Sequence, residues 1–588
     1  MILSFKFLSS SAYFAKRIED IAGFSDIRVK ISYKKPYILV WVDEKNKNFE
    51  KFTLNLDRYL YNSVFLKGLE FKEGEIKGDS FDKFAFSLSP CQKCIEEMLN
   101  KGRRFYYPFT SCGSCGNQRA FLNRYPFKRE NSTLSVFRVC GKCQKEIEEN
   151  PFRKNYPLIS CIDCAVPIRV EGKNRVFWAN EGDDYKKAFE IISKAILDGK
   201  KVLVKTLLGY KRFYKEPLKS SFVLAFNENI SKSFMLLAKE KKALFSIEKP
   251  MLFLTSSKEE IREKISAVVS VIAPFDTFSA LLANELKNDL DYIFFDEERD
   301  FDIKLDFDLP IHKISFSRYF INRNYEFFKD GDFALFSKAI FKDGFAFKDW
   351  ACRDGILDKR DRFEGEFKEI WNPFEKSVLS VIKENGIENE KSVGVYFGKR
   401  WKFYLYDEKI REVFDFGDVL ISRESLENLR EGSFKLVENF SKKFEENFER
   451  FLQKENLFEK VCALLGEEGG FERLNVLAME FGGKGGVSID CFLKDKKFDF
   501  NAFFASIMSY KIANSSNSLI AYSVFESLGD FLSNQAINVK RKFDAKHLAL
   551  CGEYIANSAF FSRFLRNARE VKVNIEYPAA LQNVFLGI

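Results

Sequence analysis

Two stretches decide how the chain folds: CQKCIEEMLNKGRRFYYPFTSCGSCG at 91–116 and CGKCQKEIEENPFRKNYPLISCIDC at 140–164. Each holds two Cys-x-x-Cys pairs with seventeen residues between them, and an offset of 49 residues places one stretch on the other. They are therefore an internal repeat. Two thiolates on a tight turn hold half of a tetrahedral zinc shell, and a second pair completes it. The predicted ligands of two zinc ions are Cys91, Cys94, Cys112, Cys115, Cys140, Cys143, Cys161 and Cys164.

The spacing leaves the pairing of these motifs open. Each repeat can close its own site, or the two repeats can exchange a pair. Four cysteines leave no position for water or substrate, so we expect structural zinc rather than catalytic zinc. Redox pairs and chance thiols are the alternatives, and four pairs in repeat register disfavour both. The isolated cysteines are predicted to pack in apolar cores; they are Cys352, Cys462, Cys491 and Cys551.

The composition limits the classes of protein to which the chain can belong. It has 588 residues, 46% hydrophobic and 30% charged, which predicts about four folded domains and excludes a mainly disordered chain. No apolar run reaches the ~18 residues of a membrane span. The N-terminal segment lacks the features of a cleaved signal, and clustered Cys pairs suit a reducing compartment, so we expect a cytoplasmic protein. The two histidines, His312 and His547, restrict catalytic triads and histidine metal sites.

Positive charge is concentrated in the cysteine region. Residues 101–154 contain twelve Lys or Arg against four Glu. Aromatic residues are interleaved with them: Phe105, Tyr106, Tyr107, Phe109, Phe121, Tyr125 and Phe127. Such a surface suits RNA, through phosphate contacts and base stacking, or a protein partner with an acidic face. The alternative is a solvated basic surface whose aromatic residues pack around the zinc.

Alternating strand and helix patterns flank this region and predict a multidomain chain of α/β and α+β class. Residues 1–88 read as a small βαββα unit. A hairpin is expected at 394–407 and a long helix at about 426–453. GGKGG at 482–486 lacks the order of a phosphate-binding loop and is read as a turn.

The cysteine region resembles the zinc-finger-like region of the HypF carbamoyltransferases, which mature [NiFe] hydrogenases. The resemblance lies in RRFYYPFTSCGSCG at 103–116, YPFKRENSTLSVFRVCGKCQKEIEENP at 125–151 and CIDC at 161–164. Positions that match the run before the third Cys pair are Pro126, Phe127, Arg129, Asn131, Thr133 and Leu134. Weaker similarity continues in the family's order at 201–213, 271–282, 457–482 and 548–561.

The resemblance implies four domains. Residues 1–88 would be a degenerate acylphosphatase-like domain, and 89–170 a zinc-finger-like module with two four-cysteine sites. Residues 171–345 would be a degenerate YrdC-like domain, and 346–588 a shortened, actin-like ATPase-fold domain related to TsaD and to the carbamoyltransferase domain. In the family, carbamoyl phosphate is hydrolysed, the carbamate is adenylated with ATP, and the carbamoyl group passes to a Cys of HypE.

Residues that this chemistry requires are missing from each domain. The first phosphate turn, FLSSSAYFAK at 7–16, contains no glycine and no arginine. Where the family has Lys-Gly-x-Gly-Gly-Phe, residues 205–210 keep only Lys205 and one glycine. In the last domain Cys551-Gly552-Glu553 replaces Ser-Gly-Gly, Leu581-Gln582-Asn583 replaces Asp-Gly-Gly, and no His pair exists. We therefore assign no catalytic and no cofactor-binding residue, and read Lys205, Glu472 and Asn557 as scaffold remnants.

The sequence thus predicts a pseudoenzyme of the HypF family, an accessory scaffold or chaperone in hydrogenase maturation. Its expected partners are the hydrogenase large subunit, HypE or another maturation protein. One alternative is an active carbamoyltransferase, dependent on carbamoyl phosphate and ATP, with rearranged site residues. Another is an RNA-binding protein that uses the basic zinc module, although nucleic acid is the less favoured partner.

Overall fold

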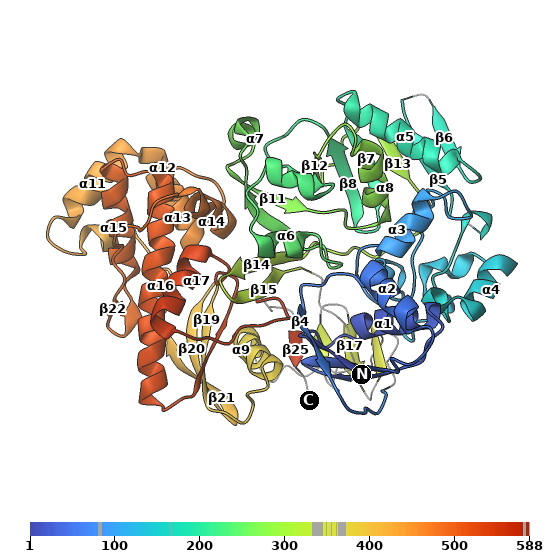
Figure 1. Ribbon diagram of the computed structural model, residues 1–588. Helices are drawn as coiled ribbons and strands as arrows, with labels where there is room; N and C mark the ends of the chain where they lie inside the picture. The colour runs from blue at the N-terminus through green and yellow to red at the C-terminus, as the bar shows by residue number, and fades with distance from the viewer. Residues whose placement is uncertain are drawn as a thin grey trace. The chain divides into compact units, whose positions relative to one another are not determined.

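The computed structural model describes residues 1–79, 85–164, 166–173, 175–331, 345–347, 350–353, 356–359, 362, 372–579 and 584–586. The chain forms two compact units (Figure 1). The first contains Met1–Tyr319 and the described residues between 331 and 362, and the second contains Phe320–Asp330 and the described residues from 372 to 586. None of the described helices combines the length and the apolar composition that a membrane crossing requires.

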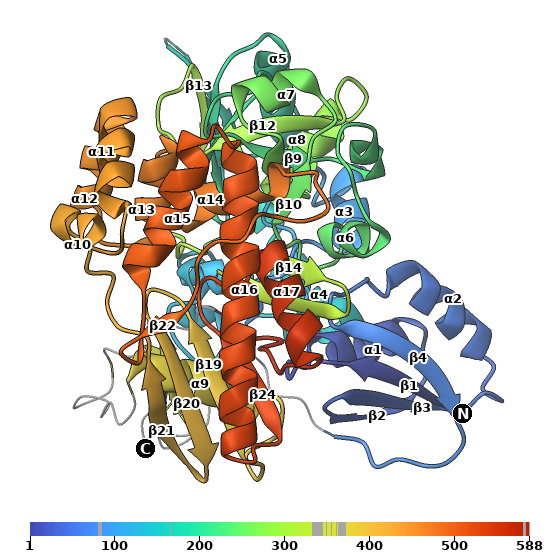
Figure 2. The ribbon, with the colours of Figure 1, turned by 90° about the vertical axis from the view of Figure 1, so that its left-hand side faces the viewer.

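The first unit begins with a four-stranded antiparallel sheet of order β2-β3-β1-β4. Its elements are β1 (Ile2–Phe7), α1 (Tyr13–Phe24), β2 (Val29–Lys34), β3 (Tyr37–Val42), α2 (Phe49–Tyr59) and β4 (Leu66–Lys72). Figure 2 shows the two helices on one face of this sheet. The five elements of the predicted βαββα unit are therefore present in the predicted order. The prediction missed a sixth element, β4, which completes a βαββαβ pattern.

The cysteine region forms a compact module, the finger module (residues 91–164), from two short helices and irregular turns. The helices are α3 (Gln92–Leu99) and α4 (Gly141–Glu149), and each begins directly after the first cysteine of a pair. The turns include η1 (Gln118–Phe121), η2 (Arg129–Asn131), η3 (Thr133–Val136), η4 (Pro151–Arg153) and η5 (Ile162–Cys164). Little regular structure is present, as expected of a domain that metal ions hold together.

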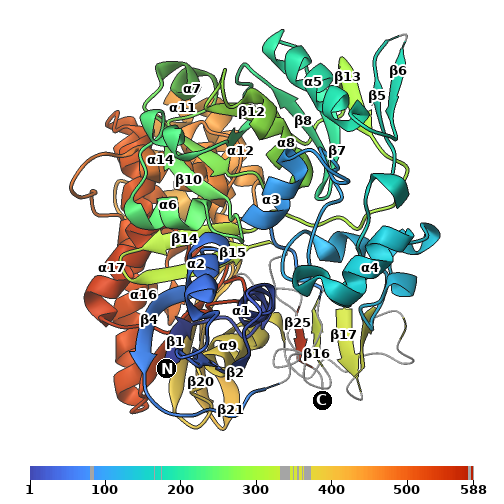
Figure 3. The same ribbon diagram turned by 45° about the vertical axis from the view of Figure 1, so that its right-hand side comes forward.

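A nine-stranded mixed sheet follows, of order β10-β11-β9-β12-β8-β7-β13-β5-β6. Its strands are β5 (Ile168–Glu171), β6 (Val176–Ala179), β7 (Val202–Thr206), β8 (Gly209–Tyr214), β9 (Phe222–Ala225), β10 (Leu252–Thr255), β11 (Val268–Ile272), β12 (Tyr292–Asp296) and β13 (Ile303–Asp306). Helices α5 (Asp184–Leu197) and α8 (Thr277–Leu286) lie along it (Figure 3). The shorter helices are η6 (Glu228–Lys232), α6 (Ala238–Leu244) and α7 (Glu259–Lys264). The apolar core of this sheet continues into the finger module.

The second unit contains a sheet of order β21-β20-β19-β24, in which β24 runs parallel to β19. Its strands are β19 (Ser392–Phe397), β20 (Trp401–Asp407), β21 (Lys409–Asp415) and β24 (His547–Cys551). Alternate residues of β19 face opposite sides: Val393 and Val395 join the larger core, and Tyr396 packs with α9 (Pro373–Glu384). The sheet is therefore buried on both faces, with the long helix α16 (Asn517–Lys542) on the larger core (Figure 2).

The other helices are α10 (Arg423–Glu427), α11 (Ser433–Lys443), α12 (Glu445–Gln453), α13 (Leu457–Leu465), α14 (Phe471–Glu480), α15 (Phe500–Ile512) and α17 (Ser558–Ala568). The remaining strands are β14 (Arg318–Asn322), β15 (Tyr325–Asp330), β16 (Phe345–Phe347), β17 (Trp350–Arg353), β18 (Ile356–Lys359), β22 (Leu493–Lys494), β23 (Lys497–Phe498) and β25 (Val584–Leu586). The hairpin expected at 394–407 is confirmed as β19–β20. The single helix expected at about 426–453 is wrong, because the chain turns at Gly432 (φ 82°) and again at Phe444, giving α10, α11 and α12.

Candidate metal centre

The first repeat brings its own four thiols together. Cys91 and Cys94 flank the start of α3, while Cys112 and Cys115 lie on the turn before η1. The Sγ atoms are 3.9 Å apart for Cys91–Cys112, 3.3 Å for Cys112–Cys115 and 3.6 Å for Cys94–Cys115. All four side chains are buried.

The second repeat has the same arrangement around α4. The Sγ–Sγ distances are 3.7 Å for Cys140–Cys161, 3.8 Å for Cys161–Cys164 and 3.9 Å for Cys143–Cys164. Cys140 and Cys164 are half-buried, so this cluster lies nearer the solvent than the first. Of the two pairings that the sequence left open, the structure has the one in which each repeat gathers its own cysteines.

The sulfur positions fit tetrahedral zinc. A zinc–sulfur bond of about 2.3 Å places the sulfurs of a regular tetrahedron about 3.8 Å apart. The Sγ–Sγ distances, between 3.3 and 3.9 Å, match this value and are far from a disulfide bond. Within each cluster all four Sγ atoms lie within 4.8 Å of one another. The two four-cysteine clusters can therefore hold two zinc ions, with no ligand position left for a substrate.

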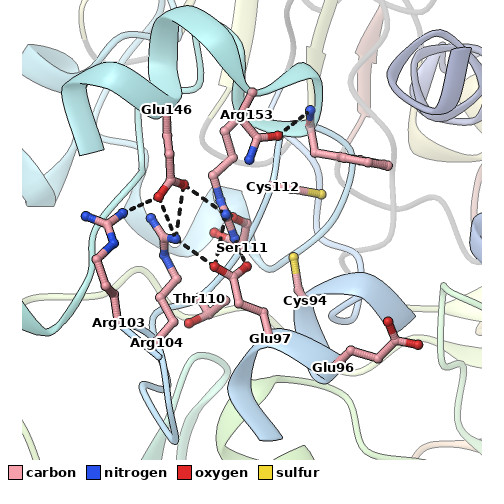
Figure 4. Close-up of polar contacts among 12 residues, drawn as sticks. Cys94, Glu96, Glu97, Arg103, Arg104, Thr110, Ser111, Cys112, Glu146 and Arg153 are labelled. Carbon is pink, nitrogen blue, oxygen red and sulfur yellow. Dashed lines mark hydrogen bonds and ion pairs between the residues drawn. The ribbon is translucent and has the colours of Figure 1, made fainter. Parts of the chain in front are cut away.

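Four charged residues join the two repeats in an arrangement that we call the Arg–Glu box: Glu97, Arg104, Glu146 and Arg153 (Figure 4). The 49-residue offset relates Glu97 to Glu146 and Arg104 to Arg153. Within repeat one Arg104 lies 2.7 Å from Glu97, and within repeat two Arg153 lies 3.0 Å from Glu146. Across the repeats Arg104 lies 3.0 Å from Glu146, and Arg153 pairs with Glu97. Each arginine thus bridges both carboxylates.

Side-chain hydroxyls cross between the repeats in the same way. Tyr107 OH lies 3.1 Å from Ser160 Oγ, and Tyr156 OH lies 2.7 Å from Ser111 Oγ. The 49-residue offset exchanges the first pair for the second. All four residues are at least half-buried, so these bonds lie inside the module.

The backbone follows the same pseudo-twofold relation. Gly113 N–H donates to the Phe152 carbonyl (2.9 Å), and Ile162 N–H donates to the equivalent Arg103 carbonyl (3.1 Å). Tyr106 and Asn155, again 49 positions apart, both have positive φ, at 54° and 56°. A side chain other than glycine rarely takes this conformation, and its occurrence at both equivalent positions marks a duplicated backbone.

Arginine side chains surround the thiol clusters. Arg104 Nη2 lies 3.5 Å from Cys143 Sγ, and Arg103 Nη2 lies 3.7 Å from the same sulfur. Arg17 of α1 is fully buried, with Nη1 3.9 Å from Cys112 Sγ. Burial alone would lower the pKa of Arg17, but the thiolates of Cys91 and Cys112 raise its pKa above the ordinary value. Cations placed in this way stabilise deprotonated, metal-binding thiolates.

The aromatic residues of the basic region face inward. Buried in the shared core are Phe105, Tyr106, Tyr107, Phe109 and Phe121. Several of the cations are internal too, including Arg104 and Arg153, and Arg129 donates to carbonyls of Phe137, Pro157 and Ile159. Of the interpretations offered above, aromatic packing around the metal sites is the one that the structure shows, and these rings are not exposed to stack on bases.

Sequence comparison points to one family. A model described as the HypF finger matches residues 91–121. The carbamoyltransferase HypF of Rhodobacter capsulatus is 33% identical over 82 residues, which are 14% of this chain and 11% of that protein. The probable carbamoyltransferase HypF of Methanocaldococcus jannaschii is 35% identical over 89 residues, or 15% and 10% of the two chains. The aligned sequence thus spans about a tenth of the length of these relatives.

The fold extends the match to nearly the whole chain. The crystal structure of HypF from T. kodakarensis superposes with a TM-score of 0.72, covering 99% of this chain and 96% of that one at 14% identity. The finger region thus matches HypF in sequence, and nearly the whole chain has the fold of HypF. Full-length HypF in a phosphate- and nucleotide-bound form gives a TM-score of 0.65 with the same coverage, at 15% identity. The predicted multidomain α/β class is thereby confirmed, while the four predicted domain boundaries remain predictions.

In the acylphosphatase-like part of the chain, several backbone donors of the turn at 7–16 are bonded within the chain. Phe7 N–H donates to the Pro36 carbonyl (2.8 Å) and Leu8 N–H to the Phe65 carbonyl (3.1 Å). Ser11 N–H donates to Ser9 Oγ (3.0 Å). The nearest arginine, Arg17, points away and donates to the Tyr59 carbonyl (2.9 Å). These backbone donors are therefore not free to bind an anion.

The lysine of the YrdC-like turn is also engaged internally. Lys205 Nζ donates to the carbonyls of Phe307 (2.7 Å) and Leu309 (3.1 Å). Burial lowers its pKa, partly offset by the charge of Asp306. In the same turn Leu207 N–H donates to Asp276 Oδ2 (2.7 Å), so a carboxylate of the chain already accepts from this backbone donor.

In the last domain, Glu553 directs its carboxylate at the β19–β20 turn. Tyr396 OH donates to Glu553 Oε2 (2.7 Å), and a Cβ atom added at Gly398 would lie only 1.7 Å from that oxygen. Burial, and then the charge of Glu553, raise the pKa of Tyr396. A cavity of about 770 Å³ lies beside this turn, lined by Lys399 and Arg400 among others. The carboxylate has the sign of charge that would repel nucleotide phosphates from the turn.

The other residues singled out from the sequence have structural contacts. Asn557 caps α17 and donates to Asn475 Oδ1 (2.8 Å), while Glu472 pairs with Lys329. His312 lies 2.9 Å from Asn123 Oδ1, and His547 pairs with Glu390.

The isolated cysteines whose side chains are described pack in apolar surroundings, as predicted for such residues. Cys462 and Cys551 are fully buried in apolar clusters, and Cys491 is half-buried and packs against one of these clusters. The side chains of Cys352, Leu581, Gln582 and Asn583 lie outside the described residues. The 482–486 segment lies outside helices and strands, and Gly486 N–H donates to Glu526 (2.9 Å).

Proposed function

We propose that this protein is a HypF-family accessory factor of [NiFe]-hydrogenase maturation that lacks carbamoyltransferase catalysis. One observation carries the proposal: donors of the first turn and Lys205 are bonded to the chain's own carbonyls, and in the last domain Glu553 places a carboxylate where the family has a glycine. The HypF fold and the finger sequence are retained. A role in binding other proteins explains this retention better than catalysis does.

The size of the expected loss supports this proposal. A positioned proton-transfer group or anion donor typically contributes ~10²–10⁴-fold to rate. The family's reaction sequence needs such groups at three successive centres. Loss at all three leaves no ordinary route to turnover, even though the last domain keeps a cavity of about 770 Å³.

We further propose that the eight cysteines hold two structural zinc ions and that the finger module is the docking surface. Its exposed face keeps several cations: Arg138, Lys142, Lys145 and Lys154. Such a face would suit an acidic surface on the hydrogenase large subunit, on HypE or on another maturation protein in the cytoplasm. Val136, which is 76% exposed, offers an apolar contact on the surface of the module.

An active carbamoyltransferase with relocated site residues is the second candidate. It is favoured by the extent of the fold match, which covers 96% of the T. kodakarensis HypF chain. Catalytic groups at new positions would be needed, because the expected positions are filled. The RNA-binding alternative is less favoured, since the aromatic residues that would stack on bases are buried.

Affinity purification of the tagged protein from its native cells, after chemical crosslinking, tests the scaffold proposal. We expect hydrogenase or maturation proteins among the captured partners. An Arg138→Glu/Lys142→Glu/Lys154→Glu variant should lose them, whereas Lys219→Glu/Lys232→Glu, at exposed sites outside the finger module, should retain them. Recovery of no hydrogenase or maturation protein by the wild-type chain would count against the proposal.

A further inference from the structure

We propose that the two four-cysteine clusters bind zinc cooperatively, because each repeat supplies a cation and a set of hydrogen bonds to the other repeat. The Arg–Glu box is the coupling element. The inference rests on the proposed zinc ligands but not on the maturation role, and it would hold for an active enzyme as well.

All three nitrogens of the Arg104 guanidinium make contacts, and these contacts join the two repeats. Nε donates to the Ser160 carbonyl at 2.8 Å, and Nη1 lies 2.7 Å from Glu97. Nη2 lies 3.5 Å from the Cys143 sulfur, a ligand of the second cluster. An arginine of repeat one therefore neutralises thiolates of repeat two and also fixes the segment that carries Cys161.

Arg153 makes the equivalent backbone contact in the opposite direction. Its Nε donates to the Ser111 carbonyl at 3.2 Å, directly before Cys112 of the first cluster. Its Nη2 pairs with Glu97, which lies on α3 three residues after Cys94. Figure 4 shows Arg153 and Arg104 side by side between the two carboxylates, on the side of α3 that carries Cys94, with Glu96 directed away.

Charge and order together make the two binding events interdependent. Zinc with four thiolates carries two net negative charges, and a buried charge of this kind needs nearby cations and donors. The side chains of Arg104 and Arg153 are only 2% and 5% exposed. They are therefore held near the thiolates only when both repeats are folded. Zinc binding orders its own repeat. Ordering one repeat then positions the arginine and the carbonyl that the other repeat needs, which lowers the cost of the second binding event.

Native mass spectrometry of the full, reduced, zinc-stripped chain, titrated with Zn²⁺, tests this proposal. Two independent equal sites would place about half of the molecules in the one-zinc form at half saturation. We expect mainly zinc-free and two-zinc forms, with the one-zinc form several-fold below that level. A one-zinc population at the independent level would overturn the coupling. Failure to bind any zinc would instead overturn the assignment of the ligands.

A neutral box isolates the coupling element. The variant Glu97→Gln/Arg104→Gln/Glu146→Gln/Arg153→Gln keeps all eight cysteines and removes two positive and two negative charges together, although Arg103 loses its pairing with Glu146. Its matched control neutralises two acids and two bases elsewhere on the same repeats: Glu96→Gln/Lys145→Gln/Glu149→Gln/Lys154→Gln. We expect the one-zinc form to rise to about half only in the neutral-box variant. Equal zinc distributions in variant and control would contradict the role of the box.

Two further measurements guard against misfolding. Saturating Co²⁺ should give the sulfur-to-cobalt charge-transfer absorption of two tetrathiolate sites in the variant, which would show that both sites still form. In a Cys161→Ser/Cys164→Ser chain, the first cluster should bind zinc at least about tenfold more weakly, as measured by chelator competition. Unchanged affinity of the first cluster would overturn the proposal independently of the box variant.

Discussion

Arg104 and Arg153 make the same contact in opposite directions: Arg104 Nε donates to the Ser160 carbonyl and Arg153 Nε to the Ser111 carbonyl. Both serines lie directly before a Cys-x-x-Cys pair of the other repeat. The finger module is therefore one interlocked body with two metal sites, rather than two small metal-binding units in sequence.

Substitution of Arg153 by methionine should strongly destabilise the first unit. Arg153 is 5% exposed and pairs with both Glu97 and Glu146, so its removal leaves the two half-buried carboxylates with Arg104 as their remaining shared partner. We expect a loss of about 3 kcal/mol in the free energy of unfolding, measured by urea denaturation of the zinc-bound protein. Lys154→Met, at the exposed neighbouring position, should change stability by less than about 0.5 kcal/mol. Equal effects of the two substitutions would contradict the box geometry.

Removal of zinc should unfold the finger module. The module has little regular structure besides α3 and α4, so its thiol clusters supply much of its order. Metal analysis of the purified protein should find two zinc ions per chain. After treatment with a strong chelator, protease cleavage within 91–164 should increase and should reverse when zinc is restored. Unchanged protease resistance in the zinc-free protein would argue that the cysteines are not structural ligands.

The sequence predicted the two clusters but not their interlocking, for a physical reason. Zinc ligation is local, so the Cys-x-x-Cys spacing was sufficient. The 49-residue offset also repeats Glu97 at Glu146 and Arg104 at Arg153, and this signal was visible in the sequence. This repeated pattern does not say whether each arginine pairs with the glutamate of its own repeat or with that of the other repeat. Both glutamates are equally suitable partners, because equivalent residues of the two repeats are identical. Only the packing of the repeats against each other decides this.

Two errors in the fold prediction have similar local causes. Strand β4, LKGLEFK at 66–72, is an edge strand with most side chains exposed, so it shows no alternation of buried and exposed residues. The segment at 426–453 has helical composition throughout, but Gly432 takes a left-handed conformation and interrupts the helix. Hairpin β19–β20 was found because its residues are buried and it has a clear turn.

Substitution of Glu553 by glycine should restore space and remove negative charge at the β19–β20 turn. The Glu553 carboxylate contacts the turn at Gly398, and Glu553 stands where the family has the last glycine of Ser-Gly-Gly. We expect the wild-type chain to show no thermal stabilisation by magnesium-ATP and the glycine variant to gain some. Glu553→Gln, which keeps the bulk and loses the charge, should lie between them. Equal responses of all three proteins would show that Glu553 does not block the turn.

Asp306 should make the first unit sensitive to acid. Burial would raise its pKa, but the Lys304 ammonium, the Phe307 N–H and the Tyr210 hydroxyl lower it below the ordinary 3.8. A carboxyl whose pKa is lower in the folded state contributes stability above about pH 4, and this contribution is lost as the pH falls through the folded-state pKa. The stability difference between wild type and Asp306→Asn should therefore shrink between about pH 7 and about pH 3 in urea unfolding. A difference that does not depend on pH would contradict the shift.

We propose above all that this chain has kept the HypF fold and lost the chemistry. The most direct test is carbamoyl phosphate-dependent cleavage of ATP to AMP and pyrophosphate by the purified protein with two zinc ions bound. We predict no product above a control without protein. Product well above that control would show that catalytic groups exist at other positions, and would contradict the account.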